Sequence, residues 1–220
     1  MMSSIKLVIF DWDGTLFDSA GQIVDSLQFA AQQHQQPLTA EDAAHIIGLG
    51  LPEVMQTLFP QVPELHDAIL ESYATHYVAH SSHDQWFVGV HEMLHDLKQQ
   101  GIILAVATGK SRRGLDRVLT TTASHDLFTV TRAASETKSK PHPLMLEEIL
   151  QHTGIDVNHA VMVGDTTYDL EMAQRIGMKR IGVSYGVHAV EELMSYEPIY
   201  IAQSLTDLHD YLIQHVQTKR

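Results

Sequence analysis

The most constraining feature of the sequence is an apolar run near its start, from Leu7 to Phe10, which is followed at once by Asp11, Trp12 and Asp13. A short, uninterrupted apolar run is typical of a strand that is buried on both faces of a parallel sheet. Because side chains alternate along an extended chain, the two aspartates should point the same way. Polar residues just beyond the carboxyl end of such a strand lie where open α/β sheets bind ligands. The pattern therefore predicts a functional site at this edge of a sheet.

From residue 85 onwards, short apolar runs alternate with amphipathic segments. Strands are predicted at residues 102–107, 127–131, 160–163, 180–183 and 200–202. Helices are predicted at residues 90–97, 111–119, 144–152, 170–176 and from 205 onwards. Such alternation implies a doubly wound parallel sheet, so the predicted fold class is α/β with a Rossmann-like core.

Residues 18–84 instead show helical spacing of apolar residues, with a capping-box pattern at Thr39 and Asp42 and prolines near the start of two further helices, at 51–59 and 62–80. We therefore expect a small all-α domain at 18–84, inserted directly after the first strand. The catalytic core would consist of residues 1–17 and 85–220. The Ser-Ser-His-Asp stretch at 81–84 is expected to be a hinge between the two parts.

The charge and composition of the chain exclude several classes of partner. A formal net charge of −13 argues against binding to nucleic acid or to an anionic membrane surface. No stretch approaches the roughly 20 apolar residues of a membrane span, and the first apolar run is too short for a signal peptide. The chain has no cysteine, which is compatible with a reducing compartment. We expect a cytoplasmic protein, monomeric or homodimeric, that acts on a small molecule.

Polar residues also follow other predicted strands and would gather at the same edge. Thr108 and Gly109 end one strand, Asp165 and Asp169 follow another, and Lys140 stands before a proline that keeps it extended. Carboxylates that meet there would repel one another unless a cation is present. Mg²⁺ suits carboxylate, water and phosphate oxygens. The sequence therefore predicts a site that holds Mg²⁺ and a phosphoryl group.

In such a site, Asp11 is predicted to attack phosphorus and form an aspartyl-phosphate. Asp13 would protonate the leaving oxygen and later deprotonate water. Thr108, the Gly109 amide and Lys140 would stabilise the transferred oxygens. The predicted reaction is the transfer of a phosphoryl group from a small phosphorylated metabolite to water.

Taken in order, the D-W-D-G-T stretch, the strand that ends in Thr108, Lys140 in K-P-x-P, and the stretch Gly164-Asp165-x-x-x-Asp169 resemble the four motifs of the haloacid dehalogenase-like (HAD) hydrolases. The helical insertion resembles the cap of the subfamily that contains phosphoglycolate phosphatase and β-phosphoglucomutase. The resemblance covers nearly the whole chain.

The resemblance also implies roles for individual residues. Asp11 would be the nucleophile and a metal ligand, and Asp13 would be the acid/base that also binds the metal through its carbonyl. Asp165 would be the third protein ligand, and Asp169 would support the metal shell. The loop Gly48-Leu49 matches in position the loop by which such caps reach the substrate.

The predicted cap contains no permanent positive charge, because Lys and Arg are absent from Leu7 to Leu97. The alternative within the same fold is a sugar phosphomutase. The resemblance implies that such an enzyme would use cap Arg and Lys residues to hold a second phosphate, and this cap has none. A neutral, cationic or small leaving group therefore fits this cap better than a bisphosphate.

Three cations, Lys110, Arg112 and Arg113, follow Thr108 closely. They could line the entrance to the site or simply face solvent on a helix, and we expect the second arrangement. Phosphoglycolate would be a substrate only if its carboxylate were bound by core residues such as Lys110 or Arg112, by backbone amides or by a cap histidine.

The stretch His91-Glu92-Met93-Leu94-His95 matches the H-E-x-x-H pattern of zinc peptidases. With 15 histidines in the chain, such a match arises easily by chance. Leu94 belongs to the apolar face of the helix, so both histidines are expected on its solvated flank. A zinc peptidase is one alternative of another class. A non-catalytic binding protein is the other, which the complete motif set disfavours.

Overall fold

The computed structural model describes residues 5–81 and 85–216. Its main element is a six-stranded sheet, formed by β1 (Leu7–Phe10), β4 (Ile103–Thr108), β5 (Val130–Ala133), β6 (Ala160–Gly164), β7 (Lys179–Val183) and β8 (Tyr200–Ala202). The strands lie in the order β5-β4-β1-β6-β7-β8, and every neighbouring pair is parallel. The predicted doubly wound α/β core is confirmed, and β1 lies between β4 and β6.

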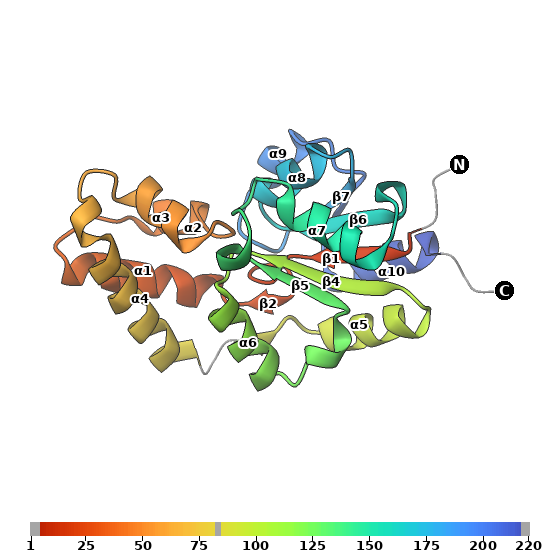
Figure 1. The fold of residues 1–220 in the computed structure, drawn as a ribbon, viewed down its shortest axis with the longest axis horizontal. Helices are drawn as coiled ribbons and strands as arrows, with labels where there is room; N and C mark the ends of the chain where they lie inside the picture. The colour runs from red at the N-terminus through yellow and green to blue at the C-terminus, as the bar shows by residue number, and fades with distance from the viewer. Residues whose placement is uncertain (1–4, 82–84, 217–220) are drawn as a thin grey trace.

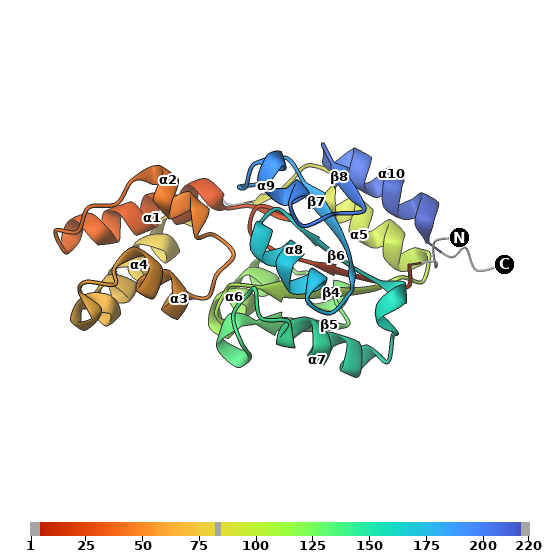
Figure 2. The same cartoon turned by 90° about the horizontal axis from the view of Figure 1, so that it is seen from above.

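Helices cover both faces of this sheet (Figures 1 and 2). They are α5 (Val90–Gln99), α6 (Arg112–Thr121), α7 (Leu144–Thr153), α8 (Thr167–Gln174), α9 (Val190–Met194) and α10 (Leu205–His215). Side chains of β1 alternate between the two faces. Val8 and Phe10 pack with residues of α5, α6 and α10, whereas Leu7 and Ile9 pack with residues of α7 and α8. Burial on both faces explains why β1 is a continuous apolar run.

Four helices form a separate group beside the sheet, drawn in red to yellow in Figure 1. They are α1 (Ala20–Gln33), α2 (Ala40–His45), α3 (Leu51–Leu58) and α4 (His66–His80), and we call residues 20–80 the helical block. The block has a cluster of buried apolar side chains of its own, which includes Leu27, Phe59 and Ile69. The strands β2 (Phe17–Asp18) and β3 (Gln85–Trp86) pair antiparallel where the chain enters and leaves the block. Residues 82–84 of the predicted hinge lie outside the described residues.

Some predicted boundaries were wrong. The helix expected at 62–80 begins as a short 3-10 helix, Pro63–Leu65, before α4. The strand expected at 127–131 begins only at Val130, because Leu127 belongs to a 3-10 helix. Helix α8 begins three residues before its predicted start, since Thr166 caps it.

The longest helix, α4, has 15 residues. In the described parts of the chain, the structure contains no helix with the length and apolar character needed to cross a membrane.

Candidate active site

The carboxyl end of β1 carries Asp11 and Asp13, which are buried, with exposed fractions of 1% and 7%. The Asp11 N–H donates to the Val163 carbonyl at 2.9 Å, so the extended course continues one residue beyond the strand. Trp12 is fully buried among aromatic side chains of the core. Gly14 then turns the chain with a φ of +80°, a conformation that favours glycine.

Three buried carboxylates meet at this edge, those of Asp11, Asp165 and Asp169. One oxygen from each lies within 4.8 Å of the others. They come from the end of β1, the end of β6 and the first turn of α8. The structure thus brings together three of the four aspartates that the sequence suggested, because β1 and β6 are parallel neighbours.

Two hydrogen-bond donors bind the Asp165 carboxylate, and two glycines leave room for it. The Thr15 hydroxyl donates to its Oδ1 at 2.8 Å, and the Val187 N–H donates to its Oδ2 at 2.9 Å. A Cβ placed on Gly14 would lie 2.2 Å from Asp165 Oδ2, and one on Gly186 would lie 2.1 Å from Asp165 Cβ. Glycine at both positions therefore permits the chain to close around this carboxylate.

Asp169 binds the capping residue at the N-terminus of α8 and also contacts Lys140. Its Oδ2 accepts hydrogen bonds from the N–H and the hydroxyl of Thr166, at 3.2 and 2.7 Å. Its Oδ1 lies 2.6 Å from Lys140 Nζ, which also donates to Asp11 Oδ1 at 2.5 Å. The Lys140 side chain has no exposed surface. Lys140 therefore joins two members of the carboxylate cluster, whereas its neighbour Lys138 is exposed.

The cluster holds more negative charge than its one lysine compensates. Burial raises the pKa of Asp11 well above its usual range, despite the attraction of Lys140. Burial and the nearby Asp169 raise the pKa of Asp165 to about 7. Burial opposes the charge on Lys140, but Asp11 and Asp169 together raise the pKa of that amine above its ordinary value.

The donor set fits a hard divalent cation. All three clustered side chains offer carboxylate oxygens, which are the ligands that Mg²⁺ prefers. Asp11 Oδ2 is buried and has no hydrogen-bond partner in the described structure. An additional positive charge would also offset the mutual repulsion of the carboxylates.

Asp13 lies outside this cluster and has different partners. Its Oδ1 accepts from the hydroxyl of Ser19 and lies 2.8 Å from Lys110 Nζ. The side chain of Lys110 is only 10% exposed. The expectation that Lys110 would simply face solvent was therefore wrong. Arg112 is only partly exposed, with 29% of its side-chain surface accessible, and it pairs with the acidic residues Asp116 and Glu136.

The loop of the helical block reaches the end of β4. Thr108 is the last residue of β4, is fully buried and accepts from the Lys110 N–H at 3.2 Å. A Cβ on Gly109 would lie 2.4 Å from the Gly48 carbonyl oxygen and 2.6 Å from that of Leu49. Gly109 thus allows the loop to pack directly against the residue that follows Thr108.

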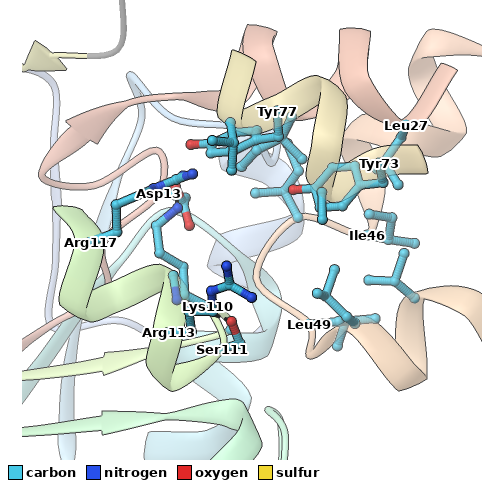
Figure 3. A pocket seen from close by; sticks show the side chains of 18 of the residues that line it. Asp13, Leu27, Ile46, Leu49, Tyr73, Tyr77, Lys110, Ser111, Arg113 and Arg117 are labelled. Carbon is cyan, nitrogen blue, oxygen red and sulfur yellow. Dashed lines mark hydrogen bonds and ion pairs between the residues drawn. The ribbon is translucent and has the colours of Figure 1, made fainter. Parts of the chain in front are cut away.

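A cavity of about 740 Å³ opens beside Asp13, between the helical block and α6 (Figure 3). Gly48 and Leu49 are among its lining residues. Arg113 also lines it, and because Arg113 is exposed as well, it both faces solvent as expected and borders the cavity. The cavity gives a bound molecule access to Asp13 from the side of the helical block.

The H-E-x-x-H stretch lies away from this arrangement, on α5. His91, Glu92 and His95 are exposed, and the two histidine rings lie 4.5 Å apart. Within the described residues, neither histidine belongs to a group of three metal-binding side chains with atoms inside 4.8 Å. In the part of the chain that the structure describes, the zinc alternative therefore has no third ligand and no buried site.

Sequence reasoning missed several residues that shape the site. Thr15 and Ser19 bind the carboxylates of Asp165 and Asp13. Thr15 is the last residue of the D-W-D-G-T stretch and Ser19 follows four residues later, and these positions were a signal that could have identified both. Tyr77 and Arg117 line the cavity, but neither stands in a motif, so only the three-dimensional approach of the Tyr77 ring to Arg117 reveals them.

Comparison with known proteins agrees with this geometry. A family model described as haloacid dehalogenase-like hydrolase matches residues 8–183. The chain is 30% identical over 212 residues to the pyrophosphatase PpaX of Bacillus pumilus, covering 94% of this chain and 95% of that protein. It is 29% identical to a phosphoglycolate phosphatase of Agrobacterium fabrum, covering 97% and 94%. A crystal structure of a predicted phosphatase from Clostridium acetobutylicum superposes with a TM-score of 0.86 at 25% identity, covering 96% of this chain and 100% of that one.

Proposed function

The chain belongs to the haloacid dehalogenase-like hydrolase family, and its relatives are phosphatases. On that basis we propose that it hydrolyses a small phosphomonoester with Mg²⁺ as cofactor, through an aspartyl-phosphate on Asp11. The observation that most supports this proposal is the buried Asp11, Asp165 and Asp169 cluster, joined to Lys140 and placed next to Asp13.

Each residue has a part in the proposed reaction. Asp11 attacks phosphorus, the bond from phosphorus to the leaving oxygen breaks, and Asp13 gives that oxygen a proton. Water then attacks the aspartyl-phosphate and passes a proton to Asp13, which releases phosphate and restores Asp11. Lys140, 2.5 Å from Asp11 Oδ1, fixes the orientation of the nucleophile.

Asp11, Asp165 and the Asp13 carbonyl would hold the cation, with Asp169 in support. When bound, Mg²⁺ would supply positive charge that offsets the phosphoryl oxygens and the carboxylates. Thr108 and the Gly109 amide would bind the transferred oxygens at the end of β4. The helical block, through Gly48 and Leu49, would cover the site and exclude water.

Phosphate release tests this function. The protein should release phosphate from a panel of phosphomonoesters in the presence of Mg²⁺, and EDTA should stop the release. A panel without phosphate release from any member would contradict the proposal. Peptide cleavage that needs zinc would favour the alternative on α5 instead.

Metal binding should also change the thermal stability in a way that depends on pH. The pKa of Asp165 is raised to about 7, whereas an unfolded chain has about 3.9. This group therefore stabilises the metal-free fold below about pH 4, and the stabilisation is lost as pH rises through about 7. Mg²⁺ binds the ionised form, so it should raise the melting temperature more at about pH 8 than at about pH 5.

Asp165→Asn is the matched variant, because it keeps the shape of the side chain and removes its titration. In this variant, the Mg²⁺-induced rise in melting temperature at about pH 8 should differ less from the rise at about pH 5. A Mg²⁺-induced shift that is equal at both pH values in the unmodified protein would contradict the assignment of the cluster as the metal site.

A further inference from the structure

The cavity beside Asp13 has two chemically different walls, as Figure 3 shows. The wall from the core is cationic, with Lys110, Arg113 and Arg117. The wall from the helical block is largely apolar, with Leu27, Ile46, Leu49 and Tyr73 among its residues. The lack of Lys and Arg in the block therefore does not leave the cavity without positive charge.

Among residues 5–81 and 85–216, two of the three cations have no acidic partner. Arg113 and Arg117 form no ion pair within the described residues, whereas the guanidinium groups of Arg112, Arg132, Arg175 and Arg180 each pair with a carboxylate. In a chain with 27 acidic residues, two guanidinium groups on one cavity wall that have no carboxylate partner in the described part of the chain are notable. They offer planar donors suited to a carboxylate or a phosphate.

Tyr77 contacts two of the three cations, Lys110 and Arg117. Its buried ring lies 5.3 Å from Lys110 Nζ and 5.3 Å from Arg117 Cζ. Lys110 is engaged by Asp13 at 2.8 Å. The contact with the aromatic ring leaves the guanidinium N–H groups of Arg117 able to bind an anion. Arg117, held in this way and half-buried, is the better anchored of the two guanidinium groups.

The cavity is larger than a very small leaving group would fill. Its volume of about 740 Å³ lies within the range of roughly 300–1,000 Å³ that is typical of pockets for larger ligands. A two-carbon leaving group would therefore leave most of it to water. The apolar side chains of Leu49, Tyr73 and Val78, which are partly or largely exposed, would then stay in contact with water.

We infer that the leaving group of the preferred substrate is amphiphilic, with an apolar body against the helical block and a separate anionic group on Arg117 and Arg113. This inference rests on the proposed phosphatase function and names its substrate class. It replaces the expectation of a neutral, cationic or small leaving group, because that expectation considered only the charges of the block. The anionic group is a carboxylate or a second phosphate.

A series of synthetic phosphomonoesters tests the inference. Alkyl phosphates of increasing length should show kcat/KM rising by about fourfold for each methylene, until the cavity is filled. A terminal carboxylate or phosphate on the longer chains should add about tenfold. Phosphoglycolate, with two carbons, should be a poorer substrate than its longer carboxylated analogues.

Arg113→Gln combined with Arg117→Gln should lower kcat/KM for the longer carboxylated or phosphorylated chains about tenfold more than for the plain alkyl chains, mainly through KM. Arg112→Gln is the matched control on the same helix. It should change kcat/KM neither for the charged chains nor for the plain alkyl chains. The inference is overturned if the shortest substrates are the best, or if the double variant affects charged and uncharged chains equally. Absence of phosphate release from every member would instead overturn the phosphatase function itself.

Discussion

Replacing Asp11 with asparagine is expected to lower phosphate release by at least about a thousandfold while the protein remains folded. The amide has nearly the same volume as the carboxylate but is not a nucleophile at phosphorus. Asp11 is 1% exposed, and burial raises its pKa, so removing its charge should not destabilise the fold strongly. Lys140 would retain Asp169 as an ionic partner at 2.6 Å. Steady-state phosphate release and a thermal melt measure both parts of this expectation.

The matched control is Glu92→Gln, which is the same acid-to-amide change on the exposed surface of α5. It should leave phosphate release unchanged and would abolish any activity of the H-E-x-x-H stretch. Phosphate release that survives in Asp11→Asn would show that Asp11 is not the nucleophile. Loss of phosphate release in Glu92→Gln alone would show that the catalytic residue lies on α5.

The central strands could be predicted closely from the sequence. β1, β4 and β6 are buried on both faces, so each is a continuous apolar run whose ends are visible as the first polar or glycine residues. The pair β2 and β3 could not be predicted, because each strand has only two residues and their pairing joins segments far apart in the chain. Short elements of this kind depend on tertiary contacts and leave little local pattern.

The clustering of Asp11 and Asp165 followed from the sequence for a topological reason. Parallel strands end at one edge of the sheet, so residues just beyond those ends come together whatever their separation in the chain. The position of Lys110 did not follow in the same way. Whether a cation next to a strand end faces solvent or an acid depends on the turn between β4 and α6, and its ion pair with Asp13 appears only in three dimensions.

Lys140→Met is the second change with a large expected effect, because it leaves Asp11 and Asp169 without their buried cation. Removing one partner of a buried ion pair typically costs about 3–5 kcal/mol of unfolding free energy. Phosphate release should fall at least about a hundredfold, since Asp11 also loses the donor that orients it. Urea unfolding in EDTA, together with phosphate release in Mg²⁺, measures both effects.

The loss of stability should be smaller at about pH 5 than at about pH 8. Burial already raises the pKa of Asp11 and Asp165, and without Lys140 these carboxyls would hold protons to still higher pH. At about pH 5, protonation of these carboxyls removes the uncompensated charge. At about pH 8, the folded state must either ionise the buried groups or keep protons that the unfolded chain releases, and both lower the free energy of unfolding. Lys138→Met, at an exposed position two residues away, should change neither stability nor activity. An equal loss at both pH values would mean that Lys140 acts through packing rather than through its charge.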